Sequence, residues 1–307
     1  MDAAAVAIGR FDAANPGCQV MAKQFDTSSG DVGTIAAAKS LIAEPSVLAT
    51  IGPILSHEMR TVGDQLDSAG FLVVSPSATD PDLNEHGWLN FVRSVPDDDE
   101  MAQAGANFLT RRLGYQRICV VGQDYGVSTD AAEVAKQALG DAAIPGCALT
   151  IGDDPHLNAE VLAISDAKPQ AVYFTGFASQ AATLLNQMRA NGVDATFMGW
   201  DGVFDEQFLT VGGNAVRGAL ILRGESPATP ELAARLSTPT GTPTALYAVE
   251  GYEIASIMMQ AVAAGATNRT SMRDYFRTFS GSGSFRHYAW TDDGQPRNPE
   301  LQLYQVN

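Results

Sequence analysis

The segment Val47-Leu-Ala-Thr-Ile-Gly-Pro-Ile-Leu-Ser56 leads from an apolar, β-branched run through a Gly-Pro turn to a serine. The stretch Ser56–Ser68 follows directly and has the 3.6-residue hydrophobic period of a helix. The segment therefore predicts a strand, a tight turn and a helix that begins at Ser56. Because ligands of open α/β sheets bind beyond the carboxyl ends of the strands, this turn is a candidate binding loop.

A second strand end carries a similar set of small hydroxyl residues, in Val73-Val-Ser-Pro-Ser-Ala-Thr79. A serine at a helix N-terminus can offer its hydroxyl and the free backbone N–H groups to an anion. Helix capping by Ser56 and Asp80 explains each loop when it is taken alone. The occurrence of two such loops favours a binding site.

Short β-rich runs and longer helical stretches alternate along most of the chain. The predicted strands are Gln19–Phe25, Val47–Ile51, Phe71–Ser75, Arg117–Val121, Ala148–Ile151, Ala171–Thr175, Thr196–Gly199 and Gly218–Leu222. The predicted helices are Thr34–Ala43, Ser56–Ser68, Asp98–Leu113, Thr129–Leu139, Asn158–Ala167, Ser179–Asn191, Thr244–Gly265 and Ser271–Phe279. This alternation predicts βαβ units with parallel sheet, and the number of units favours two α/β lobes. In the tail, the run Trp290-Thr-Asp-Asp-Gly294 predicts a β-hairpin.

Composition and charge exclude several classes of protein. The chain has 307 residues, of which 45% are hydrophobic, and this is typical of a globular protein with one large or two medium domains. Its net charge of −16 disfavours nucleic-acid binding. No run reaches the about 18 consecutive apolar residues of a membrane-spanning helix, so no membrane insertion is expected. Three cysteines permit at most one disulfide.

The sequence offers no motif for catalysis, a metal or a cofactor. There is no Walker A motif, and the spacing in Gly122-Gln-Asp-Tyr-Gly126 does not fit a dinucleotide-binding turn. The four histidines lack metal-ligand spacing. The acidic run Asp97–Glu100 suits a helix N-terminus better than a calcium site. No nucleophile–base pair stands out, so we expect no enzyme activity, no cofactor and no metal.

Seven segments in order along nearly the whole chain carry more information than any one motif. They are Val47–Pro53, Val74–Pro81, Phe91–Asp97, Asp124–Gly126, Ala171–Gly176, Phe197–Gly202 and Asp292–Gly294. Together they resemble the type I periplasmic solute-binding proteins of the branched-chain amino-acid (Leu/Ile/Val-binding) group. The resemblance implies an α/β fold with two Rossmann-like lobes, whose parallel sheets are joined by three crossovers. Lobe 1 would comprise residues 1–96 plus 226–280, and lobe 2 residues 97–225 plus 281–307.

The resemblance also implies roles for the charged and hydroxyl residues of the site. Ser56 would bind the ligand carboxylate through its hydroxyl and helix-terminal N–H, and the backbone carbonyl of Ser77 would accept from the ammonium group. Thr79 would donate to the carboxylate and accept from the ammonium, and Asp201 would be the counter-charge of the ammonium. The residue-level alternative for Asp201 is an acid of a Trp-Asp-Gly turn.

Apolar and aromatic positions follow from the same resemblance. Tyr125 would close over the ligand from lobe 2, and Phe177 stands where a tyrosine is common. Tyr247 is a weaker match, expected near the third crossover. Leu55 and Trp200 would line the pocket for the ligand side chain. A turn aromatic at Tyr125 and core packing of Phe177 stay open as ordinary structural roles.

The implied function is that of a periplasmic substrate-binding protein of an ABC transporter. It would bind a small neutral amino acid, aliphatic or branched-chain, in the interlobe cleft by hinge closure. Its partners would be this ligand and the membrane permease, and the chain would be a monomer. The alternatives are a cytoplasmic ligand-sensing regulator of the same fold, and a receptor for a small amide, urea or an aromatic acid. The first residues have no basic n-region or cleavage site, so we expect no signal peptide within the residues given.

The start of the chain departs from the family pattern, because Met1–Ala13 resembles the later part of the first helix. The family's first strand would lie between the strands predicted at Gln19–Phe25 and Val47–Ile51. Missing upstream residues, direct pairing of these two strands, or a strand from a partner chain would each explain this, and we favour the first. Leu55 stands at one position of the cysteine pair found in some members. A Cys119–Cys147 bridge across neighbouring strands stays open.

Overall fold

The computed structural model describes residues 2–28, 30–236 and 247–307. The chain divides into two compact units: unit 1 comprises Met1–Asp97 and Glu225–Glu300, and unit 2 comprises Asp98–Gly224 and Leu301–Asn307. The expected α/β fold with two lobes and three connecting crossovers is confirmed. Among the described residues, no helix is long and apolar enough to cross a membrane.

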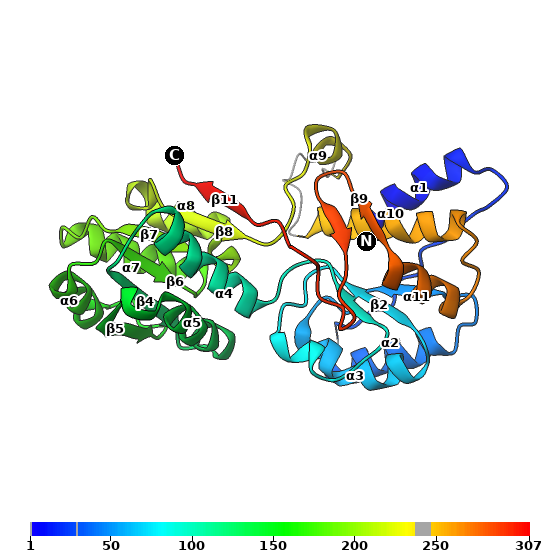
Figure 1. Cartoon of the computed structure of the whole chain (residues 1–307), viewed down its shortest axis with the longest axis horizontal. Coiled ribbons are helices and arrows are strands. Elements are labelled where there is room, and N and C mark those ends of the chain that lie inside the picture. The colour runs from blue at the N-terminus through cyan, green and yellow to red at the C-terminus, as the bar shows by residue number, and fades with distance from the viewer. Residues whose placement is uncertain (1, 29, 237–246) are drawn as a thin grey trace. The chain divides into compact units, whose positions relative to one another are not determined.

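Unit 1 is built on a parallel sheet with the order β1(Ala49–Ile51)-β2(Leu72–Ser75)-β3(Phe91–Arg93), counted over the described residues. Successive strand residues face opposite sides, which is the period of a pleated strand. Leu72 and Val74 join one core cluster with helices α10 (Ala248–Ala263) and α11 (Arg269–Thr278). Phe71 and Val73 join another with α2 (Gly30–Ile42) and α3 (Ser56–Ser68). Figure 1 shows these two helix pairs on opposite faces of the sheet. Both faces are covered, as expected for a parallel sheet.

The other helices of unit 1 complete these layers. The helices α1 (Asp2–Ala14) and α9 (Pro230–Leu236) pack with α10 in a further apolar cluster, which contains Ala7 and Leu232. Two short antiparallel strands, β9 (Ser280–Ser282) and β10 (His287–Ala289), pair outside the main sheet.

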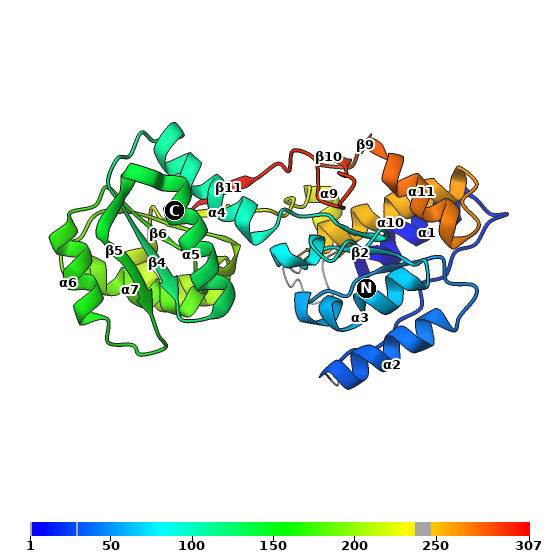
Figure 2. The ribbon, with the colours of Figure 1, turned by 60° about the horizontal axis from the view of Figure 1, so that its bottom comes forward.

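Unit 2 contains a larger sheet with the order β11-β8-β7-β6-β4-β5, in which only β11 is antiparallel to its neighbour. The strands are β4 (Ile118–Gln123), β5 (Ala143–Ile151), β6 (Ala171–Phe174), β7 (Thr196–Gly199), β8 (Leu220–Arg223) and β11 (Gln302–Gln305). The helices are α4 (Asp98–Asn107), which continues as a π-helical turn Phe108–Arg112, α5 (Gly126–Leu139), α6 (Asn158–Ala167), α7 (Ala178–Ala190) and α8 (Glu206–Gly212). The sheet has α4 and α5 on one side and α6 and α7 on the other (Figure 2). A disulfide joins Cys119 on β4 to Cys147 on β5.

Two strand predictions for unit 1 differ from the structure. Residues 19–25 form no strand, so the predicted strand there, and its pairing with the strand at 47–51, are wrong. Only Val20 and Phe25 of this segment pack against the core clusters, without a hydrogen-bonded neighbouring strand. In the opposite sense, Phe91–Arg93 was not predicted as a strand, but it pairs with β2 as β3.

The tail also differs from expectation. Residues 281–300 belong to unit 1 rather than lobe 2, because Tyr288 and Trp290 pack into the core cluster that contains Phe276. The third crossing therefore lies at Glu300 rather than near Gly281. A turn does form at Trp290-Thr-Asp-Asp-Gly294, closed by a single bridge from Trp290 to Pro296. Two backbone hydrogen bonds also join the flanking residues, from the N–H of Thr291 to the carbonyl of Gln295 at 2.8 Å and from the N–H of Arg297 to the carbonyl of Ala289 at 2.8 Å. The hairpin extends no further, since β10 pairs with β9 and β11 pairs with β8.

Candidate functional site

The two loops singled out in the sequence lie side by side in unit 1, at the carboxyl ends of the neighbouring strands β1 and β2. Three hydrogen bonds made by serine side chains join them. Ser75 Oγ donates to the carbonyl of Pro53 at 2.8 Å, and Ser77 Oγ donates to the carbonyl of Ile54 at 2.8 Å. The backbone N–H of Asp80 donates to Ser56 Oγ at 3.2 Å. These bonds hold residues 52–56 and 75–80 together as one surface, which we call the paired loops.

The glycine of the Gly-Pro turn has a backbone conformation that favours glycine. Gly52 has φ +103° and donates its N–H to the carbonyl of Val74 at 2.9 Å. A side chain at this φ would be strained. The turn leaves Ile54 and Leu55 well exposed, at 58% and 52% of their residue surface, so both can contact an apolar group of a ligand.

The helix α3 begins at Ser56 as predicted, and part of its N-terminal hydrogen-bonding capacity is already used. The backbone N–H of Leu55 donates to the carboxylate of Glu58 at 3.2 Å. Ser56 Oγ accepts from Asp80, and its hydroxyl hydrogen can still donate to an anion. Thr79 is half-buried, and within the described part of the chain its hydroxyl has no hydrogen-bond partner. Ser56 and Thr79 therefore supply two hydroxyl donors on the paired loops.

A second set of predicted residues meets in unit 2, at the carboxyl ends of the strands β4, β6 and β7. Tyr125 precedes α5 and Phe177 precedes α7, and their rings meet edge to face with centroids 5.6 Å apart. Both rings are accessible, at 60% and 38% exposure. The N–H of Phe177 donates to Gln123 Oε1 at 3.0 Å, which ties the two loops together. Phe177 is therefore more than a core residue, and the aromatic pair forms an apolar wall.

Asp201 lies beside this wall, in the loop after β7. One of its carboxylate oxygens accepts from the N–H of Gly202 at 2.8 Å, so Asp201 does act as a turn acid. It is half-buried. Burial, followed by the negative charge of Asp201, raises the pKa of Tyr173. Gly202, whose N–H binds this carboxylate, lies against the ring of Phe177.

The structure does not place Trp200 and Tyr247 as the sequence predicted. Trp200 is only 2% exposed and its indole N–H donates to the carbonyl of Gly176 at 2.8 Å, so it supports the loops rather than lining a pocket. Tyr247 lies in unit 1, before α10, and its N–H donates to the carboxylate of Glu225. It is therefore next to the second crossing, at Gly224, and not the third.

Other residues at these surfaces were not singled out from the sequence. Ile54 and Phe204 are exposed apolar side chains at the two sets of loops, and Gln123 links two of the loops in unit 2. Ile54 lies within a quoted motif, but exposure cannot be read from residue type. Phe204 stacks under the guanidinium of Arg223 at 3.6 Å, a contact between distant segments that leaves no sequence signal.

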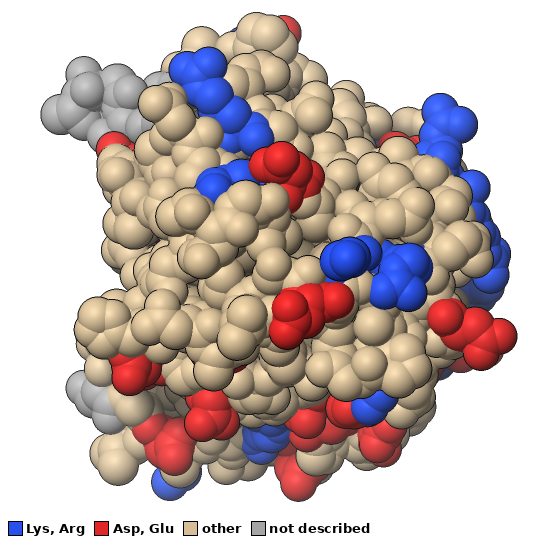
Figure 3. All heavy atoms as spheres, turned by 90° about the vertical axis from the view of Figure 1, so that its left-hand side faces the viewer, with Lys and Arg blue, Asp and Glu red and all other residues tan. Residues whose placement is uncertain are grey.

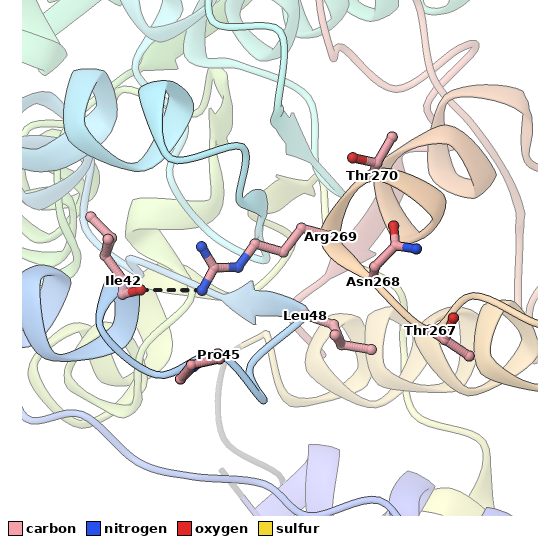
Figure 4. Close-up of a pocket in the computed structure, with 7 residues that line it drawn as sticks. All are labelled: Ile42, Pro45, Leu48, Thr267, Asn268, Arg269 and Thr270. Atoms are coloured by element: carbon pink, nitrogen blue, oxygen red, sulfur yellow. Dashed lines mark hydrogen bonds between the residues drawn. The ribbon is translucent and has the colours of Figure 1, made fainter.

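Unit 1 also has a separate pocket of about 510 Å³, and the side chain of Arg269 is one of the residues that line it (Figure 4). Arg269 projects into it and donates to the backbone carbonyls of Ile42, Glu44, Val47 and Ala69. Its guanidinium also stacks 3.7 Å above the ring of Phe71. Because these donors are directed to carbonyls, Arg269 joins segments of unit 1. No group of His, Cys, Asp or Glu among the described residues is arranged to hold a metal ion.

Charge is scattered over the face of the protein drawn in Figure 3. Lys and Arg side chains lie over the upper part and along the right-hand edge of the view, and most Asp and Glu side chains lie in its lower part.

Known proteins were compared with the chain. The model of the family described as "Periplasmic binding protein" matches residues 1–307. The Leu/Ile/Val-binding protein BraC3 of Rhizobium johnstonii is 29% identical over 61% of this chain and 51% of its own length. A leucine-, isoleucine-, valine-, threonine- and alanine-binding protein of Pseudomonas aeruginosa is 22% identical over 94% of this chain and 79% of its own length. The first of these matches thus spans only about half of the relative.

Solved structures show the same fold. The branched-chain amino acid transporter substrate-binding protein LivJ from Streptococcus pneumoniae, solved in complex with isoleucine, is 18% identical to this chain. It superposes with a TM-score of 0.80 and covers all of this chain and 90% of its own. The family match over the whole length and this shared architecture agree, and the chain belongs to the periplasmic binding protein family.

Proposed function

We propose that this protein is the substrate-binding protein of an ABC transporter and that it binds a small neutral amino acid with an aliphatic or branched side chain. The complementary chemistry of the two surfaces carries the proposal. The paired loops of unit 1 present Ser56 and Thr79 as hydroxyl donors for a carboxylate, and unit 2 presents the carboxylate of Asp201 for an ammonium group. The names of the relatives support the same ligand class.

A zwitterion needs such partners because its two charges are costly to desolvate unless each is hydrogen-bonded. The backbone carbonyl of Ser77 adds an acceptor for the ammonium group, since the Ser77 hydroxyl is already directed to Ile54. The ligand side chain would contact the exposed apolar residues Leu55, Tyr125 and Phe177. The apolar character of these three residues favours a neutral, apolar ligand side chain.

The proposal includes hinge closure, in which one ligand engages both units and the permease recognises the closed form. It also includes a monomeric protein located in the periplasm. The disulfide between Cys119 and Cys147 supports that location, since disulfides persist in oxidising compartments. A cytoplasmic regulator of the same fold is disfavoured for this reason.

Binding without catalysis is part of the same proposal. Two serine hydroxyls of the paired loops are bound to backbone groups, because Ser56 Oγ accepts from an N–H and Ser77 Oγ donates to a carbonyl. A nucleophilic serine instead needs an adjacent base. These serines therefore suit ligand binding.

Thermal-shift measurements test the ligand class. The panel contains the standard amino acids, urea, small amides and aromatic acids. A ligand at 100 times its dissociation constant should stabilise the protein by about 2.7 kcal/mol, which is readily measured. We expect stabilisation by neutral aliphatic amino acids. Stabilisation only by carboxylates that lack an amine would contradict the role of Asp201, and stabilisation only by urea or amides would contradict the amino-acid assignment.

Two substitutions then test the individual contacts by calorimetry with the stabilising amino acid. Thr79→Val removes a hydroxyl and keeps the shape, and Asp201→Asn removes the charge. Each should weaken binding by about tenfold or more, the loss expected when one charge-assisted hydrogen bond is removed. Unchanged affinity in both variants would contradict the zwitterion site.

A further inference from the structure

We propose that Arg93 is a positioning residue for the ligand: its buried guanidinium holds the backbone on both sides of Thr79 and so directs the Thr79 hydroxyl to the ligand carboxylate. This inference rests on the proposed function and assigns a role to a residue that does not itself touch the ligand.

The geometry of Arg93 is that of a clamp. Its side chain is 0% exposed at the carboxyl end of β3. Nη1 donates to the carbonyl of Ala78 at 3.1 Å, and Nη2 donates to the carbonyl of Asp80 at 2.9 Å. Nη2 also donates to the side-chain oxygen of Asn84. The two carbonyls flank Thr79 directly, so one rigid group holds the residues before and after it.

The same two residues are held from the other direction by the paired loops. The N–H of Ala78 donates to Ser75 Oγ at 3.0 Å, and the N–H of Asp80 donates to Ser56 Oγ at 3.2 Å. The N–H and the C=O of both neighbours of Thr79 are therefore engaged. Because this backbone is held on both sides, the loop is ordered before the ligand arrives, and the Thr79 hydroxyl stays available to bind it. A loop that is already ordered saves the entropy that binding would otherwise cost.

The backbone of Arg93 is also held by hydrogen bonds. Its backbone N–H donates to the carbonyl of Gly294 at 3.0 Å, and its carbonyl accepts from the indole N–H of Trp290 at 2.7 Å. The guanidinium is planar and carries its donors in a fixed fork, so it sets the spacing of the acceptors it binds. A lysine has one flexible ammonium group and cannot hold two carbonyls with the same fixed geometry. An arginine is therefore the side chain that this position requires.

A double-mutant cycle tests whether Arg93 acts through Thr79. Calorimetry measures the affinity for L-leucine of the parent, Arg93→Lys, Thr79→Val and the double variant. Arg93→Lys should weaken binding about tenfold in the parent but less than about twofold in the Thr79→Val background, because residues that act through one contact are not additive. Independent losses that add in the double variant would overturn the proposal.

A second ligand separates positioning from general destabilisation. L-leucinamide keeps the ammonium group and side chain of leucine but lacks its carboxylate. Arg93→Lys should therefore weaken L-leucine binding strongly and L-leucinamide binding little. Equal losses for both ligands would mean that Arg93 serves only the structure of unit 1.

Two further variants complete the design. Arg269→Lys alters another arginine that gathers backbone carbonyls in unit 1, and it should lower the melting temperature while the affinity stays unchanged. Asn84→Ala removes a side-chain acceptor of the Arg93 guanidinium, and it replaces Arg93→Lys if that variant does not fold. It should weaken L-leucine binding by a smaller factor, and this effect should disappear in the Thr79→Val background. If no amino acid binds to the parent, the proposed function fails and the role of Arg93 fails with it. If amino acids bind and the losses add, only the inference about Arg93 fails.

Discussion

Replacement of Glu250 by alanine should strongly destabilise unit 1, because Glu250 is the centre of a buried ionic cluster. Glu250 is 0% exposed on α10, and its carboxylate lies 2.8 Å from Nη2 of Arg286, which is 5% exposed. The same carboxylate accepts from the hydroxyl of Tyr288 at 3.1 Å and from the backbone N–H of Ser226 at 2.9 Å. Glu250 therefore joins its own helix to two segments that are distant in the sequence, at Ser226 and at Arg286–Tyr288.

The expected loss of stability follows from the charge of Arg286, which stays buried after Glu250 is replaced. Burial by itself lowers the pKa of Arg286, but the charge of Glu250 and the contact with Tyr288 raise it above its ordinary value, so the guanidinium stays charged. Loss of one partner from a buried ion pair costs about 3–5 kcal/mol, since the charge that stays buried loses its counter-charge. For a unit of this size each kcal/mol lowers the melting temperature by about 2–4 °C, so we expect a decrease of roughly 6–20 °C.

Calorimetry together with tryptophan fluorescence measures this change. Trp88 and Trp290 lie in unit 1 and report its unfolding. The matched control is Glu133→Ala, which breaks the exposed pair of Glu133 with Lys136 on α5 and should cost less than about 1 kcal/mol. A double variant that replaces Glu250 and Arg286 by methionine should recover much of the loss. If Glu250→Ala is as stable as the Glu133→Ala control, the reasoning is refuted.

Three other predictions concern separate features. Ser75→Ala removes the buried hydroxyl that binds Pro53 and Ala78, so the free energy of unfolding from denaturant titration should fall by about 2 kcal/mol; a change under about 0.5 kcal/mol would mean that these bonds contribute little. Burial, together with nearby negative charge, raises the pKa of Tyr173 and Tyr288, so these groups keep their protons above pH about 10 while the unfolded chain loses them, and stability should fall as the pH rises past about 10. Tyr173→Phe should make that decrease less steep, and an unchanged slope would contradict the assignment. Cys147→Ser opens the disulfide with Cys119, whose partners are 28 residues apart, and should lower the stability of unit 2 by about 3–4 kcal/mol, with no further effect of a reducing agent.

Helix positions were the most predictable feature of the fold. The predicted helices Ser56–Ser68 and Asn158–Ala167 agree with α3 and α6 at both ends. An amphipathic period is a local property of the sequence, so it can be read without knowledge of the neighbours. The strand predicted at Gln19–Phe25 failed for the opposite reason: β-rich composition is local, but a strand exists only when another strand pairs with it.

The candidate site was partly predictable in the same way. The sequence located the loops that carry Ser56, Thr79, Tyr125 and Asp201, because each loop follows an apolar strand. It did not show that Trp200 is buried, since an aromatic residue beside a candidate site suits either a pocket or a core.

The sequence by itself determined the α/β class, the two-lobe organisation and the loops that carry the site, because alternating periods, turn residues and strand ends are all local patterns. Only the tertiary structure decided that residues 281–300 pack into unit 1, that three serine hydrogen bonds join the paired loops, and that Arg93 holds both neighbours of Thr79. These contacts join residues that are distant in the chain, and their energy depends on burial and direction. Both properties arise only when the sheets and helices have packed.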